Sequence, residues 1–248
     1  MHPSDSTPRP PGDFADALAT PQPLLLVGGQ AVNLWALYYL DPTSDLAPFV
    51  SRDADVLGDQ DTLKLLGQVT GQTPRFFPLK PPTNEIGVVV AKDATGAPLL
   101  IEVLRYIRGA TNEELRDPVY LFALGEKAVQ VQAPGPIALL RAKIANLIEI
   151  KQTGRQDARH VLILVRALPR YLADLQASVR DKAMTERKLV DYLELLLATF
   201  TSKGGRKVCA DLVIDPGQVF KGLSAEGMPR VEAFLTKRLP EALSPRRK

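Results

Sequence analysis

The sequence predicts an α/β protein, with a mixed β-sheet and flanking helices in the first half of the chain and an α-helical domain after it. Between residues 24 and 133, short apolar runs of strand length alternate with helical periodicity and turn signals. After the Pro134-Gly135-Pro136 segment, the apolar stripes have helical period and little β character. We therefore predict a flexible arm with a short helix over 1–20, an α/β domain over 21–133 and a helical domain over 134–248.

The first segment, 1–12, is rich in proline and small polar residues, which predicts a loose arm. Asp13 can cap a short helix that runs to Thr20, because Pro21 and Pro23 follow and end it.

The apolar run 24–27 predicts a buried strand that ends on Gly28-Gly29 and continues into a helix over 31–40. This helix is apolar around most of its circumference, so we expect protein to cover it. The following segment, 41–48, contains two prolines and predicts a loop.

The segment 51–57 predicts a strand that carries two carboxylates. Side chains two positions apart on a strand point the same way, so Asp53 and Asp55 face one side together. Like charges this close repel each other unless a cation lies between them, and hard divalent cations prefer oxygen ligands. A carboxylate pair next to a glycine turn with exposed backbone N–H groups is a place to hold a nucleoside triphosphate.

A third carboxylate follows in a predicted β-hairpin, whose arms are 85–91 and 98–106 and whose tip is 93–96. Glu102 lies in the second arm among aliphatic residues. Burying a lone carboxylate costs several kcal/mol unless it is paired, and a divalent metal shared with Asp53 and Asp55 would pair it.

The remaining elements are assigned from periodicity and capping signals. Asp59 or Asp61 begins a helix that Gly71 ends, and 112–116 is one helical turn. A last strand is predicted over 128–132, a loop over 202–207, and four helices over 137–151, 155–173, 184–201 and 231–243.

The ordered combination of Gly28-Gly29, a helix, Asp53-Ala54-Asp55 and Glu102 resembles the nucleotidyltransferase superfamily related to DNA polymerase β. It is most similar to the abortive-infection (AbiEii/MenT-like) toxins and the minimal nucleotidyltransferases. The resemblance implies transfer of a nucleoside monophosphate from an NTP to a hydroxyl, with Asp53, Asp55 and Glu102 as catalytic residues and ligands of two Mg²⁺ ions, or of Mn²⁺. It also implies that Gly28 and Gly29 contact the phosphates and that Gln30 binds the nucleotide; the alternative for Gly28-Gly29 is a plain tight turn.

A second block is similar to that family: Lys143 on a helix, then Arg155-Gln156-Asp157 at the start of the next. By this resemblance Lys143 neutralises triphosphate charge and Asp157 holds the lysine or the helix in place. The alternative is that Lys143 and Arg155 are solvated helix charges. Where the family often has another aspartate, this chain has His160. One interpretation of this residue is a general base; the favoured one is a packed or capped residue, because it lies beside the apolar run 161–165. Arg52 either binds phosphate or faces water.

The implied partners are an NTP, an acceptor that is RNA such as tRNA or protein, and an antitoxin protein if the chain is a toxin. Basic residues outnumber acidic ones over 203–248, which is compatible with RNA and also with an ordinary solvated surface. Two alternatives remain: a nucleotidyltransferase that modifies a small molecule of the antibiotic type, and a catalytically silent binding module.

Composition indicates the cellular compartment in which the protein is expected. The single cysteine, Cys209, excludes a disulfide within one chain and fits the reducing cytoplasm. No apolar run approaches the roughly 20 residues that span a bilayer, and no signal peptide opens the chain. We expect a cytoplasmic protein with no membrane partner.

Overall fold

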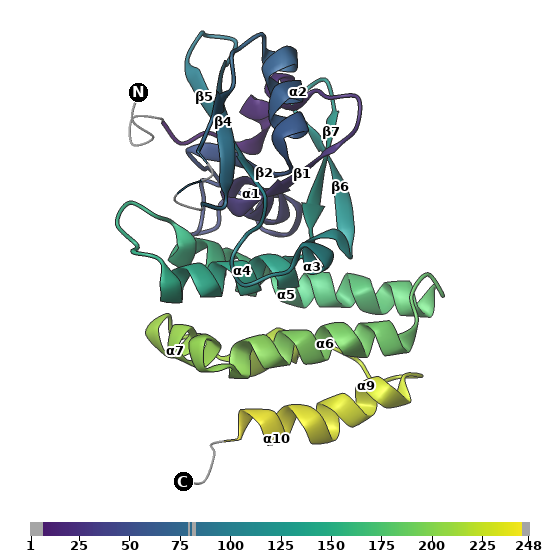
Figure 1. The fold of residues 1–248 in the computed structure, drawn as a ribbon. Coiled ribbons are helices and arrows are strands. Elements are labelled where there is room, and N and C mark those ends of the chain that lie inside the picture. The colour runs from purple at the N-terminus through teal and green to yellow at the C-terminus, as the bar shows by residue number, and fades with distance from the viewer. Residues whose placement is uncertain (1–6, 79, 81–82, 245–248) are drawn as a thin grey trace. The chain divides into compact units, whose positions relative to one another are not determined.

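The structure is a computed structural model that describes residues 7–78, 80 and 83–244. The chain divides into two compact units, Met1–Ala142 and Lys143–Lys248. The change from strands to helices occurs where the sequence predicts it, since β7 (Val129–Pro134) is followed directly by α4 (Pro136–Glu149) (Figure 1). The division between the units falls slightly later, within α4.

The first unit contains a seven-stranded mixed sheet in the order β3-β4-β5-β2-β1-β7-β6, which confirms the predicted α/β class. Its strands are β1 (Leu24–Val27), β2 (Asp53–Leu57), β3 (Arg75–Phe76), β4 (Glu85–Lys92), β5 (Pro98–Leu104), β6 (Val119–Leu124) and β7. Two of the pairings are parallel, β1 with β7 and β2 with β5, and the others are antiparallel. The two parallel pairings place strands far apart in sequence at the centre of the sheet.

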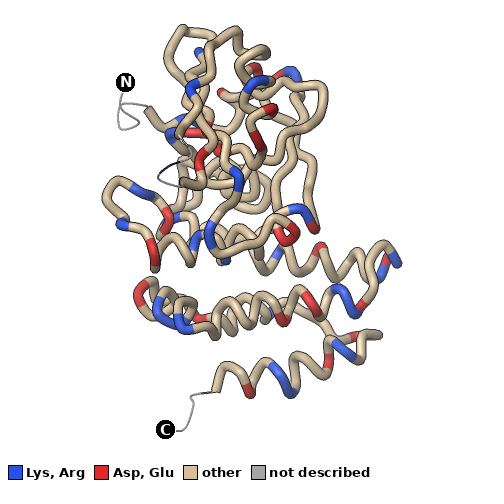
Figure 2. The backbone as a smooth tube through the Cα atoms, in the orientation of Figure 1, with Lys and Arg blue, Asp and Glu red and all other residues tan. Residues whose placement is uncertain are grey.

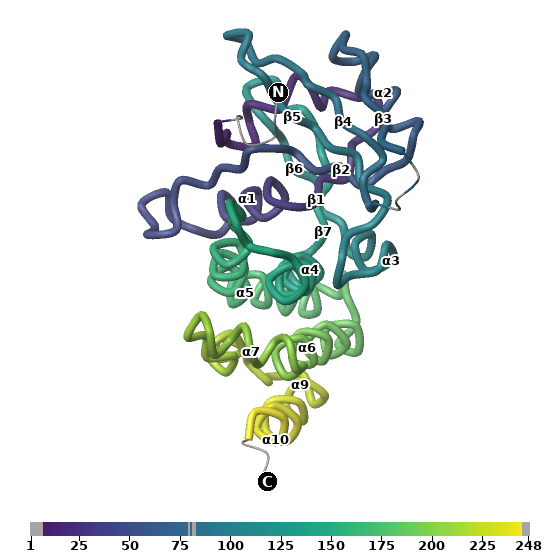
Figure 3. The backbone as a smooth tube through the Cα atoms, turned by 60° about the vertical axis from the view of Figure 1, so that its left-hand side comes forward, coloured from purple at the N-terminus to yellow at the C-terminus, as the bar shows by residue number. Residues whose placement is uncertain are grey.

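Helix α1 (Gly28–Tyr39) follows β1 without a loop and is buried along most of its length, as its all-round apolar sequence predicts. It packs against β1, β2 and β7, and Figure 3 shows it beside β1. Trp35 stacks on Tyr39 and its indole N–H donates to the carbonyl of Pro134 at 2.8 Å. These contacts fix the helix, and with it the glycine turn at its start.

Helix α2 (Gln60–Thr70) packs on β4. Asp59 is the residue that begins it, since its carboxylate accepts from the backbone N–H of Asp61 and Thr62. Gly71 ends it in the left-handed region, as predicted.

The predicted hairpin is formed by β4 and β5, with Asp93 accepting from the N–H groups of Thr95 and Ala97 in the turn. The helical turn α3 (Asn112–Arg116) is also confirmed. Strand β6 has no counterpart in the sequence prediction, although its apolar and aromatic residues are typical of a strand; it forms one edge of the sheet through β7.

The arm before β1 is more ordered than its composition predicts. Residues 1–6 lie outside the described residues, but Arg9 forms an antiparallel bridge with Ser51. The single helix predicted from Asp13 to Thr20 is wrong: two short 3₁₀ helices, η2 (Pro11–Phe14) and η3 (Asp16–Leu18), occupy the segment and bury Phe14 and Leu18.

The second unit is helical in its described part. After the end of α4 come α5 (Asp157–Arg180), α6 (Glu186–Thr201), α7 (Lys203–Asp211), α8 (Pro216–Phe220), α9 (Pro229–Ala233), a π-helical turn η4 (Phe234–Arg238) and α10 (Leu239–Leu243). Helix α6 packs against α5, α7, α9 and α10 (Figure 3). The core is built from leucine-rich faces of α5 and α6. Cys209 is buried there, and burial raises the pKa of its thiol to about 11.

The loop predicted over 202–207 is wrong, because α7 begins at Lys203. The hydroxyl of Ser202 accepts from the N–H of Gly205 at 2.9 Å and caps the helix. A Cβ on Gly205 would lie 2.0 Å from the carbonyl oxygen of Thr199, so the glycine permits close packing against the end of α6. Gly205 therefore serves helix packing, and the Ser202 cap supplies the helix start. Among the described residues, no helix is long and apolar enough to cross a membrane.

Candidate metal centre

The candidate site lies at the centre of the sheet in the first unit, where β1, β2 and β5 are neighbours. Strand β1 is fully buried and turns directly into α1 at Gly28. Strand β2 alternates as predicted, with Ala54 and Val56 buried and Asp53 and Asp55 half-buried. The two carboxylates therefore lie on the same side of β2.

The position of Glu102 is set by strand pairing. In the parallel ladder between β2 and β5, Asp55 lies opposite Glu102. Paired residues of neighbouring strands point to the same face of a sheet, so Glu102 joins the two aspartates. Carboxylate oxygens of Asp53, Asp55 and Glu102 all lie within 4.8 Å of one another.

The three carboxylates are arranged to hold a metal ion. At an effective dielectric constant of about 20, two unit charges this far apart repel by about 3 kcal/mol. A divalent cation among them converts that repulsion into attraction, and carboxylate oxygens are the ligands that Mg²⁺ and Mn²⁺ prefer. Among the described residues, this is the single group of three or more acidic, histidine or cysteine side chains close enough to share an ion.

Gly28 fits this centre for a steric reason. Its φ of +62° lies in the left-handed region, and a Cβ built on it would lie 1.7 Å from Oδ2 of Asp55. Any side chain here would have to displace the carboxylate of a candidate ligand. The glycine therefore lets the first turn of α1 approach Asp55 directly.

The start of α1 also presents backbone donors. Val27, at the N-cap position, makes no side-chain cap, and Gly28 and Gly29 bring no side chains. The first N–H groups of a helix lack intrahelical acceptors and attract anions. Phosphate binding by Gly28 and Gly29 stays a prediction, and this geometry is compatible with it.

Gln30 was predicted to contact the nucleotide. Its side chain is 1% exposed, and its amide donates to the carbonyl of Arg9 at 3.0 Å and to that of Ser51 at 3.4 Å. Because this side-chain amide is already hydrogen-bonded, a nucleotide contact by Gln30 would have to use its backbone N–H. The contact stays a prediction. Arg52 is exposed at the start of β2, and its phosphate contact likewise stays a prediction.

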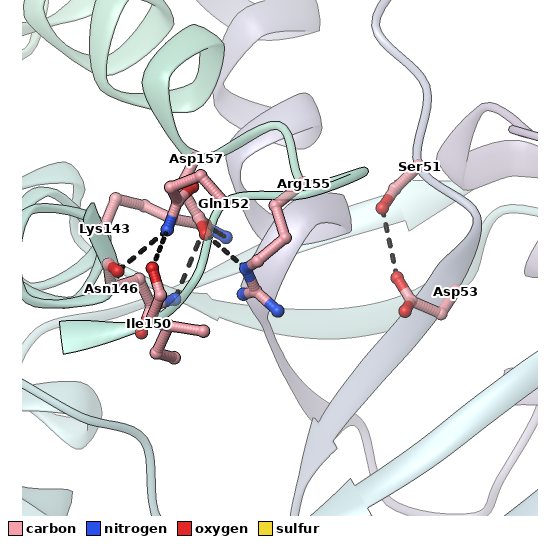
Figure 4. Close-up of polar contacts among 8 residues, drawn as sticks. All are labelled: Ser51, Asp53, Lys143, Asn146, Ile150, Gln152, Arg155 and Asp157. Atoms are coloured by element: carbon pink, nitrogen blue, oxygen red, sulfur yellow. Dashed lines mark hydrogen bonds and ion pairs between the residues drawn. The ribbon is translucent and has the colours of Figure 1, made fainter. Parts of the chain in front are cut away.

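Ser51 is a polar residue of this centre that the sequence analysis did not identify. It is 7% exposed, and its hydroxyl donates to Oδ1 of Asp53 at 3.2 Å (Figure 4). Its signal in the sequence is its place two residues before Asp53, on the same side of the chain.

The second unit holds the other predicted block. The ammonium of Lys143 donates to Oδ1 of Asp157 at 2.9 Å, and Arg155 donates to Oδ2 at 2.7 Å (Figure 4). Burial raises the pKa of Asp157, but the charges of Lys143 and Arg155 and their hydrogen bonds outweigh it and lower the pKa to about 2. The carboxylate is therefore ionised at neutral pH, and the pair is buried, not solvated. A role of Lys143 and Asp157 in nucleotide binding stays a prediction.

His160 lies one turn after Asp157 and is 4% exposed. Neither of its ring nitrogens has a hydrogen-bond partner among the described residues. Burial, followed by the positive charge of Lys143, lowers the pKa of His160 well below its usual value. The imidazole is therefore neutral at pH 7.

The basic residues of 203–248 are partly engaged within the second unit. Lys207 pairs with Asp211 and Arg238 with Glu194. Figure 2 shows acidic residues interspersed with the basic ones along these helices. Arg246, Arg247 and Lys248, which contribute to the predicted excess, lie outside the described residues.

No model of a protein family matches the chain, and no curated protein matches it by sequence. Among solved structures, the chain is similar to an antigenic nucleotidyltransferase-like protein from Paracoccidioides brasiliensis. The two share 14% sequence identity over 85% of this chain and 83% of the other, with a TM-score of 0.40.

Proposed function

We propose that the protein is a Mg²⁺-dependent nucleotidyltransferase that moves a nucleoside monophosphate from an NTP to a hydroxyl group. The observation that carries the proposal is the convergence of Asp53, Asp55 and Glu102 within 4.8 Å, next to the uncapped glycine turn of α1. The ordered sequence motif that resembles the nucleotidyltransferase superfamily supports it independently of this distance.

In the proposed reaction the acceptor oxygen bonds to the α-phosphorus, the bond from that phosphorus to the oxygen that bridges to the β-phosphate breaks, and pyrophosphate leaves. Mg²⁺, when bound, would supply a lower pKa for the acceptor hydroxyl and neutralisation of charge on the leaving pyrophosphate. Asp53, Asp55 and Glu102 would hold the metal, and Glu102 would also orient the acceptor hydroxyl. Backbone N–H groups at Gly28 and Gly29 bind phosphate oxygens. The acceptor proton passes to water or to a carboxylate.

The proposed acceptor is RNA such as tRNA, or a protein, and the proposed role is that of a toxin paired with an antitoxin. Both follow from the sequence resemblance to the abortive-infection branch. Transfer to a small cationic molecule of the antibiotic type is the alternative acceptor, and a silent binding module is the alternative to catalysis.

The test is incubation of the full chain with each α-labelled NTP and Mg²⁺, together with total RNA, cell lysate or an aminoglycoside-type compound. We expect label in one acceptor class, loss of transfer on chelation of Mg²⁺, and loss in Asp55→Ala. The matched control is Asp61→Ala, which removes an exposed carboxylate of the same unit that pairs with Lys64. If calorimetry finds no Mg²⁺-dependent NTP binding and no label is transferred, the enzymatic proposal is wrong.

A further inference from the structure

The candidate metal ligand Asp53 is held by residues outside the carboxylate group. Ser51 precedes it by two residues, and the Ser51 hydroxyl donates to Oδ1 of Asp53 (Figure 4). The carboxylate of a strand residue can rotate about its side-chain bonds. A hydrogen bond to one of its oxygens restricts that rotation and leaves lone pairs on both oxygens for a metal.

Ser51 is itself fixed by the N-terminal segment. Arg9 and Ser51 exchange two backbone hydrogen bonds, from Arg9 N–H to Ser51 O at 2.8 Å and from Ser51 N–H to Arg9 O at 3.0 Å. The guanidinium of Arg9 pairs with Asp93, in the β4–β5 turn, at 3.0 Å. A single β-bridge therefore joins the residues just before β2 to the N-terminal segment, which lies more than forty positions earlier in the sequence.

A buried amide fastens this bridge to α1. Gln30 donates through Nε2 to the carbonyl oxygens of both bridged residues, Arg9 and Ser51. Its Oε1 accepts from the amide of Asn33 at 3.2 Å, and Asn33 is fully buried. One side chain thus connects the first turn of α1, which presents the candidate phosphate donors, with the residue that orients Asp53.

We infer that Gln30, Ser51 and the backbone of Arg9 are positioning residues for the metal ligand Asp53. The inference rests on the proposed function, because it concerns the same metal centre. In this role the side chains of Gln30 and Ser51 act through Asp53: they set the orientation of a ligand before the ion arrives. Residues in this role typically change metal affinity by about 10- to 100-fold when removed.

The chain gives a clean way to test the role of the Ser51 hydroxyl. Mn²⁺ affinity of the full chain, measured from the free-ion signal in electron paramagnetic resonance, is compared for the wild type, Ser51→Ala, Ser51→Thr and Gln30→Leu. We expect about a 10-fold weaker affinity in Ser51→Ala, recovery in Ser51→Thr, which restores a hydroxyl, and weakening in Gln30→Leu. The matched control is Ser178→Ala, which removes a hydroxyl bonded within α5 and leaves Mn²⁺ affinity unchanged.

A second readout separates positioning from general damage. In the transfer assay, the Mg²⁺ concentration for half-maximal rate rises in Ser51→Ala while kcat at saturating Mg²⁺ stays near the wild-type value. The thermal midpoint followed by fluorescence of Trp35, the one tryptophan, reports whether the first unit is intact. If Gln30→Leu fails to fold, Ser51→Ala decides the question.

The outcomes distinguish the two proposals. If Asp55→Ala abolishes Mn²⁺ binding but Ser51→Ala binds Mn²⁺ as tightly as the wild type, the positioning inference is wrong and the proposed function stands. If the wild type binds no Mn²⁺, or if Asp55→Ala binds it equally well, both are overturned.

Discussion

The two charged clusters of this protein differ in the charges that they bring together: one gathers carboxylates alone, and the other pairs a carboxylate with cations. In the first unit, Asp53, Asp55 and Glu102 bring three like charges together on half-buried positions of two strands. In the second unit, Asp157 is 2% exposed and lies between two cations, Lys143 and Arg155.

The three carboxylates of the first unit are suited to binding a cation, whereas the charge of Asp157 is already neutralised by Lys143 and Arg155. Like charges that converge gain from an added cation, whereas a carboxylate already bridged by two cations gains nothing. Both clusters were singled out by the same sequence resemblance, and only their surroundings tell them apart. Loss of Asp157 should therefore lower stability, and loss of one of the three carboxylates should weaken ion binding.

The largest effect is expected at Asp157. Asp157→Ala leaves the buried Lys143 without its carboxylate, and loss of one partner of a buried pair typically costs about 3 to 5 kcal/mol. Urea denaturation followed by far-UV circular dichroism, to which the helices of the second unit contribute strongly, measures the change. Asp211→Ala, which breaks the exposed pair with Lys207, is the matched control and should cost less than about 1 kcal/mol. Equal effects of the two substitutions would contradict the comparison.

The next largest effect is expected in the first unit, as a gain in folding stability when Mg²⁺ binds. At a Mg²⁺ concentration of about 100 times Kd, the wild type should gain about 2.7 kcal/mol of stability. Asp55→Asn should lose that gain, yet be at least as stable as the wild type without metal, because it removes a mutually repelling charge. Thermal unfolding by Trp35 fluorescence, with and without Mg²⁺, checks both signs. A metal-free Asp55→Asn that is clearly less stable than the wild type would argue against repulsion at this centre.

Gly28→Ala tests the approach of α1 to Asp55. It should cost about 2 kcal/mol, from the left-handed backbone and from the displaced carboxylate, and it should weaken Mn²⁺ binding. Gly71→Ala is a close control, since Gly71 has a φ of +65° and no atom within 4 Å of an added Cβ. That control should cost about 1 kcal/mol and keep Mn²⁺ affinity; equal Mn²⁺ affinities in both variants would show that Gly28 does not shape the centre.

The smallest effect is expected for the contribution of His160 to the loss of folding stability at acidic pH. Because its folded pKa lies well below the unfolded value, the unfolded chain binds more protons as pH falls below about 6.5, and stability is lost in that direction. Between pH 7.5 and 5.5 the loss should be about 1.4 kcal/mol. The groups that act on this imidazole are Lys143, Asp157, Arg155 and Arg159. His160→Leu should remove this part of the pH dependence in denaturation monitored by circular dichroism; an unchanged pH profile would refute the assignment.

Local sequence patterns were sufficient for several elements. The two-residue strand period placed Asp53 and Asp55 on one side of β2, and Gly71 ended α2. Asp59, which begins α2, was one of two predicted starts. The change from strands to helices at the Pro134-Gly135-Pro136 segment was also confirmed. Each of these depends on neighbours a few residues away, which a single sequence displays directly.

Packing decided where the local patterns misled. The Gly-Gly pair after Ser202 indicates a turn in isolation, yet Gly205 is needed to let α7 approach the end of α6. The proline-rich start of the chain indicates a loose arm, yet Arg9 pairs with Ser51. In both cases a contact from another element outweighs local backbone preference.

The sequence by itself determined which carboxylates and glycines could form a site, because residue type and strand period are local properties. Only the tertiary structure decided that Glu102 joins the aspartates, since the register of the parallel β2–β5 pairing is a contact between distant segments. It also decided that Gln30 faces inward and that Asp157 is enclosed by cations. Burial and charge pairing depend on what packs around a residue, and spacing along the chain does not contain that information.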